Sequence, residues 1–211
     1  MALWPFSRRR PPQPVPDPEH MPAPLTGCAP VPGLIWGWRP DLWAAARKPA
    51  AQDGFQPWQA LSGDVTLHSD DPRLTASLSQ RPAQSGAFGI DLHLTDPGAA
   101  RYLSLSSALP LADAARITRH DILSIDVDLG TVPDAPVFLR LNLGWGPNVG
   151  EQTQAWPAGA PDARFAFDLF YMAFDNRVLD KAWIDLIFEA PLADHLAVED
   201  IALQRHPRAT L

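Results

Sequence analysis

The sequence lacks most of the features that assign a compartment or a chemistry directly. Cys28 is its single cysteine, so an intramolecular disulfide and a metal cage of thiolates are both excluded. No run approaches the roughly 20 apolar residues of a membrane span, and the N-terminus lacks the uninterrupted apolar core of a secretory signal. We therefore expect a cytoplasmic protein without a membrane span.

Positive charge is also scarce. The 211 residues carry a net charge of −7, and since the first 40 residues are basic, the acidic excess belongs to the rest of the chain. An acidic body repels a phosphate backbone. We therefore expect no nucleic-acid partner.

Helical periodicity is nearly missing, whereas segments with apolar residues two positions apart follow one another closely. This alternation is the pattern of a strand with one buried and one wetter face. The segments are residues 65–68, 74–80, 88–95, 102–106, 122–129, 137–143, 165–170, 182–189 and 197–204. About eight or nine short strands predict an all-β fold, an antiparallel β-sandwich or jelly roll.

Two details refine this prediction. In segment 197–204, Val198 and Ile201 have opposite parity, so both can be buried only through a bulge near Glu199 and Asp200. Residues 110–118 contain no internal breaker and are expected to form one short helical turn before the next strand.

Proline recurs every few positions from residue 1 to residue 33. Proline fixes φ and removes a backbone donor, so we expect residues 1–33 to be a disordered, polyproline-like tail and residues 34–211 to be the β-sandwich domain. Trp4, Phe6 and the arginines of this tail suit a recruiting role, but a plain disordered leader is the favoured interpretation.

Three tryptophans follow the tail, at Trp36, Trp38 and Trp43. Their indoles bury too much area to be left in water. One interpretation packs them on the outside of the sandwich as a lid, and another makes one of them a platform on which a sugar stacks. We favour the lid.

Residues 137–143 form the clearest strand, with Arg140 and Asn142 on its polar face. The strand ends in a stretch of glycine, proline and asparagine, which predicts a loop that presents Trp145 beside Asn148. Planar polar groups next to an aromatic plate suit a sugar, so Arg140, Asn142, Trp145 and Asn148 are the candidate ligand-binding residues. Trp156 and Tyr171 are further candidates for this site. The alternative is that Trp145 folds back over the core.

Four carboxylates on polar strand faces are weak catalytic candidates: Asp126, Asp128, Asp185 and Glu189. If their strands are neighbours, two carboxylates can approach within the separation of up to about 10 Å that glycoside hydrolysis requires. The favoured interpretation is a solvated acidic face, because a catalytic acid also needs a partly desolvated pocket. No serine sits in a glycine-flanked elbow.

A metal site is not expected either. The six histidines show no spacing that would place a pair on one zinc ion. Calcium takes oxygen ligands from loops, which Asp70, Asp71, Glu199 and Asp200 contain, but structural acidic turns are favoured for these residues. We therefore expect no cofactor and no metal.

Several motifs carry a resemblance to a known family. They are Trp38-Arg39-Pro40-Asp41-Leu42-Trp43, Arg140-Leu141-Asn142 with Gly146-Pro147-Asn148, Phe167-Asp168-Leu169, Trp183-Ile184-Asp185-Leu186-Ile187-Phe188-Glu189 and Arg205-His206-Pro207-Arg208-Ala209. On these motifs, residues 36–211 resemble an alphaproteobacterial domain-of-unknown-function family without an assigned activity. The proline-rich leader departs from the charged start of that family. More remotely, residues 198–203 resemble the closing strand of galactose-binding-like jelly rolls, a likeness of fold that does not fix function.

The leading hypothesis is thus a non-catalytic binding module on a β-sandwich, with a glycan-like ligand first and a protein partner second. One alternative is a carboxylate-based enzyme that acts on a glycan. The other is a structural or interaction protein with no small ligand.

Overall fold

The computed structural model describes residues 25, 27–83, 87–172, 174 and 178–208. Within them, 13 strands form three sheets in which every pairing is antiparallel. The predicted all-β class is confirmed. None of the described helices is long and apolar enough to cross a membrane.

The three sheets have the following strands, each given in spatial order. Sheet 1 contains β1 (Trp36–Trp38), β13 (Asp200–Pro207), β7 (Asp121–Asp128) and β10 (Asp162–Asp168). Sheet 2 contains β3 (Val65–Ser69), β6 (Tyr102–Ala108), β11 (Lys181–Glu189), β8 (Val137–Trp145) and β9 (Asn148–Ala155). Sheet 3 contains β12 (His195–Val198), β5 (Phe88–Thr95), β4 (Thr75–Pro82) and β2 (Ala51–Phe55). The helices are short: α1 (Asp41–Ala44), α2 (Leu111–Ala114) and the 3₁₀ turns η2 (Pro97–Ala99) and η3 (Leu169–Tyr171).

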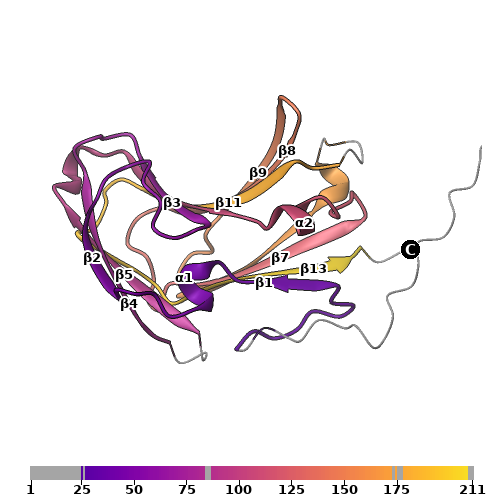
Figure 1. Ribbon diagram of the computed structural model, residues 1–211, viewed down its shortest axis with the longest axis horizontal. Coiled ribbons are helices and arrows are strands. Elements are labelled where there is room, and N and C mark those ends of the chain that lie inside the picture. The colour runs from indigo at the N-terminus through magenta and orange to yellow at the C-terminus, as the bar shows by residue number, and fades with distance from the viewer. Residues whose placement is uncertain (1–24, 26, 84–86, 173, 175–177, 209–211) are drawn as a thin grey trace, which may run out of the picture.

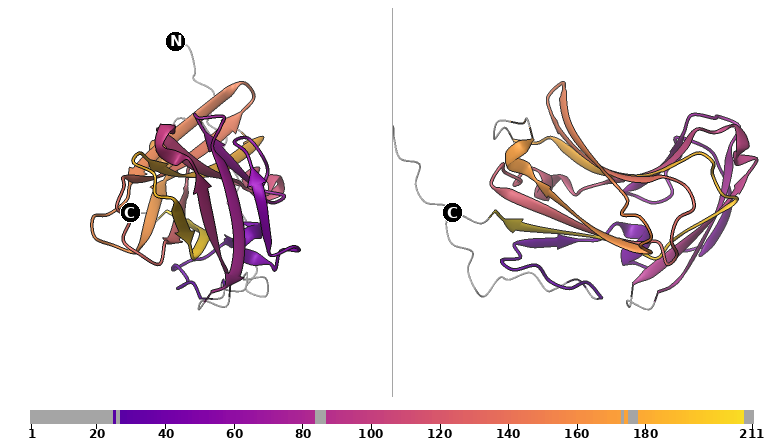
Figure 2. Two further views of the ribbon diagram at one scale, coloured as in Figure 1. Left: turned by 90° about the vertical axis from the view of Figure 1, so that its left-hand side faces the viewer. Right: turned by 180° about the vertical axis from the view of Figure 1, so that it is seen from behind.

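Sheets 1 and 2 lie as two layers, and sheet 3 stands at one end of them (Figure 1). Seen from behind, the outer side of sheet 2 is saddle-shaped, with the β8–β9 hairpin rising at one end and sheet 3 at the other (Figure 2). This curvature makes the outer face of sheet 2 concave.

The core fills the space between the layers. Leu139 and Leu141 of β8 and Ile184 and Leu186 of β11 point inward with 0 % exposure, and Ile125 of β7 faces them from sheet 1 in the same buried cluster. Full burial of each such side chain contributes roughly 1.5–3 kcal/mol. Because alternate residues point to opposite faces, this burial also fixes which side chains face outward.

The last predicted strand has its irregularity where a bulge was expected, but there the chain changes from one strand to another. β12 ends at Val198 and β13 begins at Asp200, so the chain passes from sheet 3 into sheet 1 at Glu199. Both Val198 and Ile201 are buried, as the parity argument requires. The helical turn predicted within residues 110–118 is α2.

Trp43 lies inside the core rather than on its outside. It is fully buried, and its Nε1 donates to the Val198 carbonyl at 3.0 Å. Trp36 and Trp38 stack with ring centroids 6.5 Å apart and are only partly buried against the core. Trp38 is in register with Leu203, which shares the inner face of sheet 1 with Ile125, so these indoles pack at the edge of the core and the predicted outer lid is wrong.

The N-terminal strap, residues 27–33, packs against sheet 1, so Gly33 does not mark the start of the folded region. Val31 is buried, and its N–H donates to Gln204 Oε1 at 3.0 Å. Gln204 Nε2 donates in turn to Cys28 Sγ at 2.8 Å and to the Ala29 carbonyl at 3.0 Å. The rest of the predicted tail, residues 1–24 and 26, lies outside the described residues.

Candidate functional site

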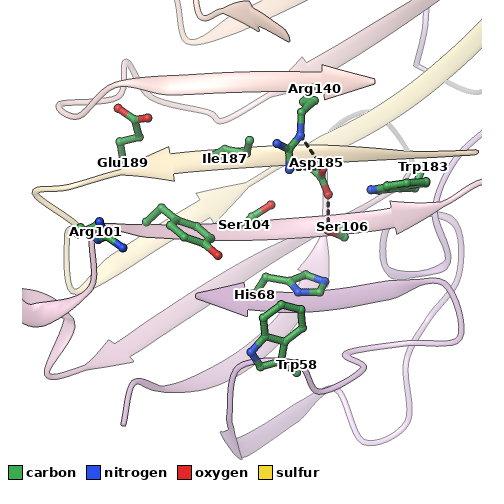
Figure 3. Close-up of a pocket in the computed structure, with 11 residues that line it drawn as sticks. Trp58, His68, Arg101, Ser104, Ser106, Arg140, Trp183, Asp185, Ile187 and Glu189 are labelled. Atoms are coloured by element: carbon green, nitrogen blue, oxygen red, sulfur yellow. Dashed lines mark hydrogen bonds and ion pairs between the residues drawn. The ribbon is translucent and has the colours of Figure 1, made fainter. Parts of the chain in front are cut away.

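A groove of about 910 Å³ follows the concave outer face of sheet 2. Its floor is built by the outward residues of β11 and β6, which alternate with the buried residues described above. These floor residues are Trp183, Asp185, Ile187 and Glu189 of β11 and Tyr102, Ser104 and Ser106 of β6. His68 of β3, Arg140 of β8 and the loop residues Trp58 and Arg101 complete the lining. Trp183 and Glu189 lie at opposite ends of the groove, with Trp58 and His68 along one flank (Figure 3).

Asp185 is the centre of a polar row that crosses the sheet. It pairs directly with Ser106 on β6 and with Arg140 on β8. Its Oδ2 accepts from Arg140 Nε at 3.0 Å, Arg140 Nη2 at 2.9 Å and Asn142 Nδ2 at 2.8 Å, while Oδ1 accepts from the Ser106 hydroxyl. Charge-assisted bonds of this kind are the strong ones in proteins. They hold the guanidinium of Arg140 in one orientation.

Burial differs sharply between the two charged partners. The Asp185 side chain is 3 % exposed, whereas that of Arg140 is 37 % exposed. The Asp185 carboxylate therefore lies beneath the surface and orients Arg140. The Arg140 guanidinium is the member of the pair that a ligand can reach (Figure 3).

Trp58 stands at the rim of the groove in an unusual backbone conformation. Its φ is +72°, and the Gln59 N–H donates to the Gln56 carbonyl at 3.2 Å, closing a turn with Pro57 in its second position. The third position of such a turn favours glycine, and a bulky residue there is an outlier that costs on the order of 1–3 kcal/mol. The indole is nevertheless 71 % exposed. An exposed tryptophan in a strained position is therefore a candidate ligand contact.

His68 supports this indole from the sheet. The two rings meet edge to face with centroids 4.6 Å apart. Burial lowers the pKa of His68, and the charge of Asp185 opposes that effect only in part. His68 is therefore neutral at pH 7.

Ser104 lies directly opposite His68 in the floor. It is 4 % exposed, and within the part of the chain that the structure describes its hydroxyl has no hydrogen-bond partner. A buried polar group without a partner costs about 1–3 kcal/mol. Such a group in the floor of a groove suits a site that a ligand completes.

The far end of the groove is charged. Arg101 Nε donates to Asp70 Oδ2 at 2.6 Å, and the Arg101 backbone N–H donates to Asp70 Oδ1 at 2.9 Å. Glu189 is opposite Tyr102 and is exposed. Across residues 25, 27–83, 87–172, 174 and 178–208, no cation pairs with the Glu189 carboxylate.

The four candidate ligand-binding residues do not stay together. Arg140 lines the groove, and Asn142 lies on the same face but is 2 % exposed and gives its amide to Asp185. Trp145 ends β8 at a hairpin turn, where its ring lies 6.3 Å from that of Phe174 and packs against the core. Asn148 pairs with Trp145 across that turn. Trp145 and Asn148 are outside the groove, because the expected loop is a tight hairpin into β9.

The two further aromatic candidates also lie elsewhere. Trp156 Nε1 donates to the Ala160 carbonyl at 2.8 Å, and its ring packs 5.7 Å from that of Phe165. Tyr171 is 74 % exposed and lies 5.6 Å from the guanidinium of Arg208. Neither residue lines the groove.

The catalytic candidates are divided between two sheets. Asp126 and Asp128 are on β7 in sheet 1, whereas Asp185 and Glu189 are on β11 in sheet 2. Asp126 Oδ1 accepts from Arg164 Nε at 2.6 Å, and Asp128 Oδ1 accepts from the Gly130 N–H at 2.7 Å. The condition that their strands be neighbours is therefore not met.

The loop carboxylates considered for calcium each pair with an arginine. The pairs are Asp70 with Arg101, Asp71 with Arg73, Glu199 with Arg81 and Asp200 with Arg39. Among the described residues, no group of three or more His, Cys, Asp or Glu side chains is placed to hold a metal ion.

Sequence reasoning missed Trp58, Trp183 and His68 as members of the site. Alternation does place Trp183 on the same face as Asp185, so that signal was present in the strand 182–189. For Trp58 the only local signal is the preceding Pro57, which favours a turn. No local pattern places His68 beneath it.

Residues 23–211 match a family of unknown function, DUF6478. The chain belongs to this family. Among curated proteins, none matches the chain.

Several solved structures are similar to this member of DUF6478. One is a family 11 carbohydrate-binding module from Clostridium thermocellum in complex with a β-1,3-1,4-mixed-linked tetrasaccharide, with 12 % identity, 75 % of this chain and 98 % of that chain covered, and a TM-score of 0.44. Another is the apo form of a cyclase from Fischerella sp., with 11 % identity, coverage of 77 % and 100 %, and a TM-score of 0.43. A third is a carbohydrate-binding module studied for specific mannan recognition, with 10 % identity, coverage of 82 % and 96 %, and a TM-score of 0.39.

Proposed function

We propose that this DUF6478 protein is a non-catalytic binding module and that the groove on sheet 2 holds a glycan chain. The observation that carries the proposal is Trp58, an indole that is 71 % exposed and held at φ +72° on the rim of the groove. Strain of this kind persists where the surrounding structure maintains it for a role, and ligand clamps are among the places where it collects.

The rest of the lining has the chemistry that a sugar chain requires. The C–H faces of a sugar ring pack on indoles, which Trp58 and Trp183 supply, and its hydroxyls need donors and acceptors in fixed positions. The guanidinium of Arg140 is held in one orientation by Asp185, and the unpartnered hydroxyl of Ser104 lies in the floor. From Trp183 to Glu189 the floor extends for about 20 Å along β11. This length suits a chain of several rings.

The carboxylate geometry supports binding rather than hydrolysis. Asp185 and Glu189 are four residues apart on one strand, which separates their backbones by about 13 Å. The carboxyl pairs of glycosidases lie within roughly 5–10 Å of each other. Asp185 also accepts three hydrogen bonds from Ser106, Arg140 and Asn142 and forms an ion pair with Arg140, which suits a positioning group.

A glycan array probed with wild type, Trp58→Ala and Trp183→Ala tests the proposal. We expect wild type to bind a set of glycans, and both variants to lose about 5- to 30-fold in affinity, since stacking of a ring on an aromatic side chain contributes on the order of 1–2 kcal/mol. Thermal stability of Trp58→Ala should change little, because the side chain is mostly exposed.

Trp145→Ala is the matched control, since Trp145 packs against the core outside the groove. It should lower stability and leave glycan binding intact. Failure of wild type to bind any glycan, or binding that survives the loss of both Trp58 and Trp183, would contradict the proposal.

A further inference from the structure

We infer that the groove binds neutral or amino-bearing glycans more tightly than acidic ones, with Glu189 as the residue that discriminates between them. This inference rests on the proposed function and specifies its ligand class. It follows from the distribution of charges along the groove.

Each arginine of the lining is already neutralised by a carboxylate of its own. Arg140 is bound by the buried Asp185 through two nitrogens, and its Nη1 lies 3.8 Å from the Oε2 of Glu151. Arg101 is bound by Asp70. Neither arginine therefore brings the groove a net positive charge for a uronate or a sulfate.

Glu189 is the lining charge that remains. Its carboxylate pairs with no cation in the part of the chain that the structure describes, and it lies at the end of the groove away from Trp183 (Figure 3). His68 adds no compensating charge, because burial keeps its ring neutral at pH 7. Counted with Asp70, the partner of Arg101, two arginines stand against three carboxylates, and the charges at the groove sum to −1.

One cation lies just beyond the other end. The Lys181 ammonium is 5.8 Å from the centroid of the Trp183 ring, on the far side of that indole from Glu189 along β11. About 26 Å of strand separates Lys181 from Glu189, which exceeds the screening length of about 8 Å at physiological salt. Lys181 therefore does not cancel the charge at the Glu189 end.

The expected selectivity is modest because Glu189 is exposed to solvent. An exposed ion pair is worth up to about 1 kcal/mol, which corresponds to a factor of about five in affinity. An ammonium group on a ligand gains this factor at low salt, and a carboxylate or sulfate loses a similar one.

The test compares wild type, Glu189→Gln and Asp53→Asn on an array of neutral, amino-bearing, uronate and sulfated glycans. Binding is measured at low salt and at about 0.5 M salt, where the screening length falls to a few ångströms. Asp53 is exposed on β2 in sheet 3, so its variant removes one negative charge away from the groove. The hexamers of glucosamine and of N-acetylglucosamine form a matched pair that differs in the charged amine.

We expect wild type to bind neutral or amino-bearing glycans and to bind no uronate or sulfated glycan more tightly. Glu189→Gln should weaken binding of the amino-bearing glycans by about three- to fivefold at low salt and improve that of acidic ones, while Asp53→Asn changes neither. Preference of wild type for acidic glycans, or equal effects of the two variants, would overturn the selectivity and leave the binding function standing. Absence of binding to every glycan on the array would overturn both.

Discussion

Replacement of Trp58 by glycine should give a more stable protein than replacement by alanine, although both variants lack the indole. Both lose the edge contact with His68, so that loss cancels in the comparison. Alanine keeps a Cβ at φ +72°, where an L-residue is disfavoured by about 1–2 kcal/mol. Glycine escapes this penalty but gains freedom in the unfolded chain, which offsets about 0.4–1 kcal/mol of the gain. The glycine variant should therefore be more stable by about 0.5–1 kcal/mol.

Urea unfolding of the two variants, followed by the fluorescence of the remaining tryptophans, measures this difference. Gly54→Ala calibrates it, since Gly54 has φ +79° and no atom within 4 Å of an added Cβ. That substitution should destabilise the protein by an amount similar to the advantage of glycine at position 58. A Trp58→Ala variant as stable as Trp58→Gly would show that the turn is not held in the left-handed region, and the functional argument from strain would fail.

Three further predictions concern polar groups that are buried or partly buried. Asp185→Asn should destabilise the protein by about 2–3 kcal/mol. This is less than the roughly 3–5 kcal/mol lost when a fully buried ion pair is broken, because Arg140 reaches water. Urea unfolding measures the loss, with Asp53→Asn as a control that should change stability by under about 0.5 kcal/mol. Because the pKa of His68 is lowered, neutral His68 contributes stability that is fully present above pH 6.5 and is lost as the pH falls through the lowered pKa. Between pH 7.5 and pH 5 the free energy of unfolding should therefore fall by more in wild type than in His68→Asn. Burial raises the pKa of Cys28 to about 12, so alkylation of Cys28 at pH 8 should be on the order of a thousandfold slower than in the unfolded chain. Gln204→Ala should accelerate this alkylation at least about tenfold. An unchanged rate in that variant would mean that Gln204 does not hold the strap.

Periodicity along single strands was enough to predict most of the sheets. β5 begins and ends at the predicted residues, and the parity of Val198 and Ile201 locates the irregularity at Glu199, although it predicts a bulge rather than the observed change of sheet. β9 was missed because it is an edge strand with no buried residue, so it leaves no alternating signal in the sequence. Without a second strand to pair with, the glycines and proline after Trp145 predict a loop rather than a hairpin turn.

The site was harder to predict because it depends on which strands pair. The polar face of strand 137–143 correctly placed Arg140 toward the groove, but its partner Asp185 lies 45 positions away. Trp58 reaches the groove only through a backbone angle that favours glycine, which no propensity for tryptophan would suggest. Long-range pairing and local strain are both invisible to periodicity.

Strand pairing distinguishes two acidic faces that look alike in the sequence. In the sequence, Asp126 on β7 and Asp185 on β11 have the same appearance, a carboxylate on the polar side of an alternating strand. In the structure, the face of Asp126 is covered by the strap, whose Cys28 thiol donates to Asp126 Oδ2 at 2.9 Å. The face of Asp185 is left open and concave, and its guanidinium partner is accessible. The strap and Arg164 thus engage Asp126 in contacts within the fold, whereas the guanidinium beside Asp185 faces a groove of about 910 Å³. These contacts favour a structural role for Asp126 and place the larger candidate site on sheet 2.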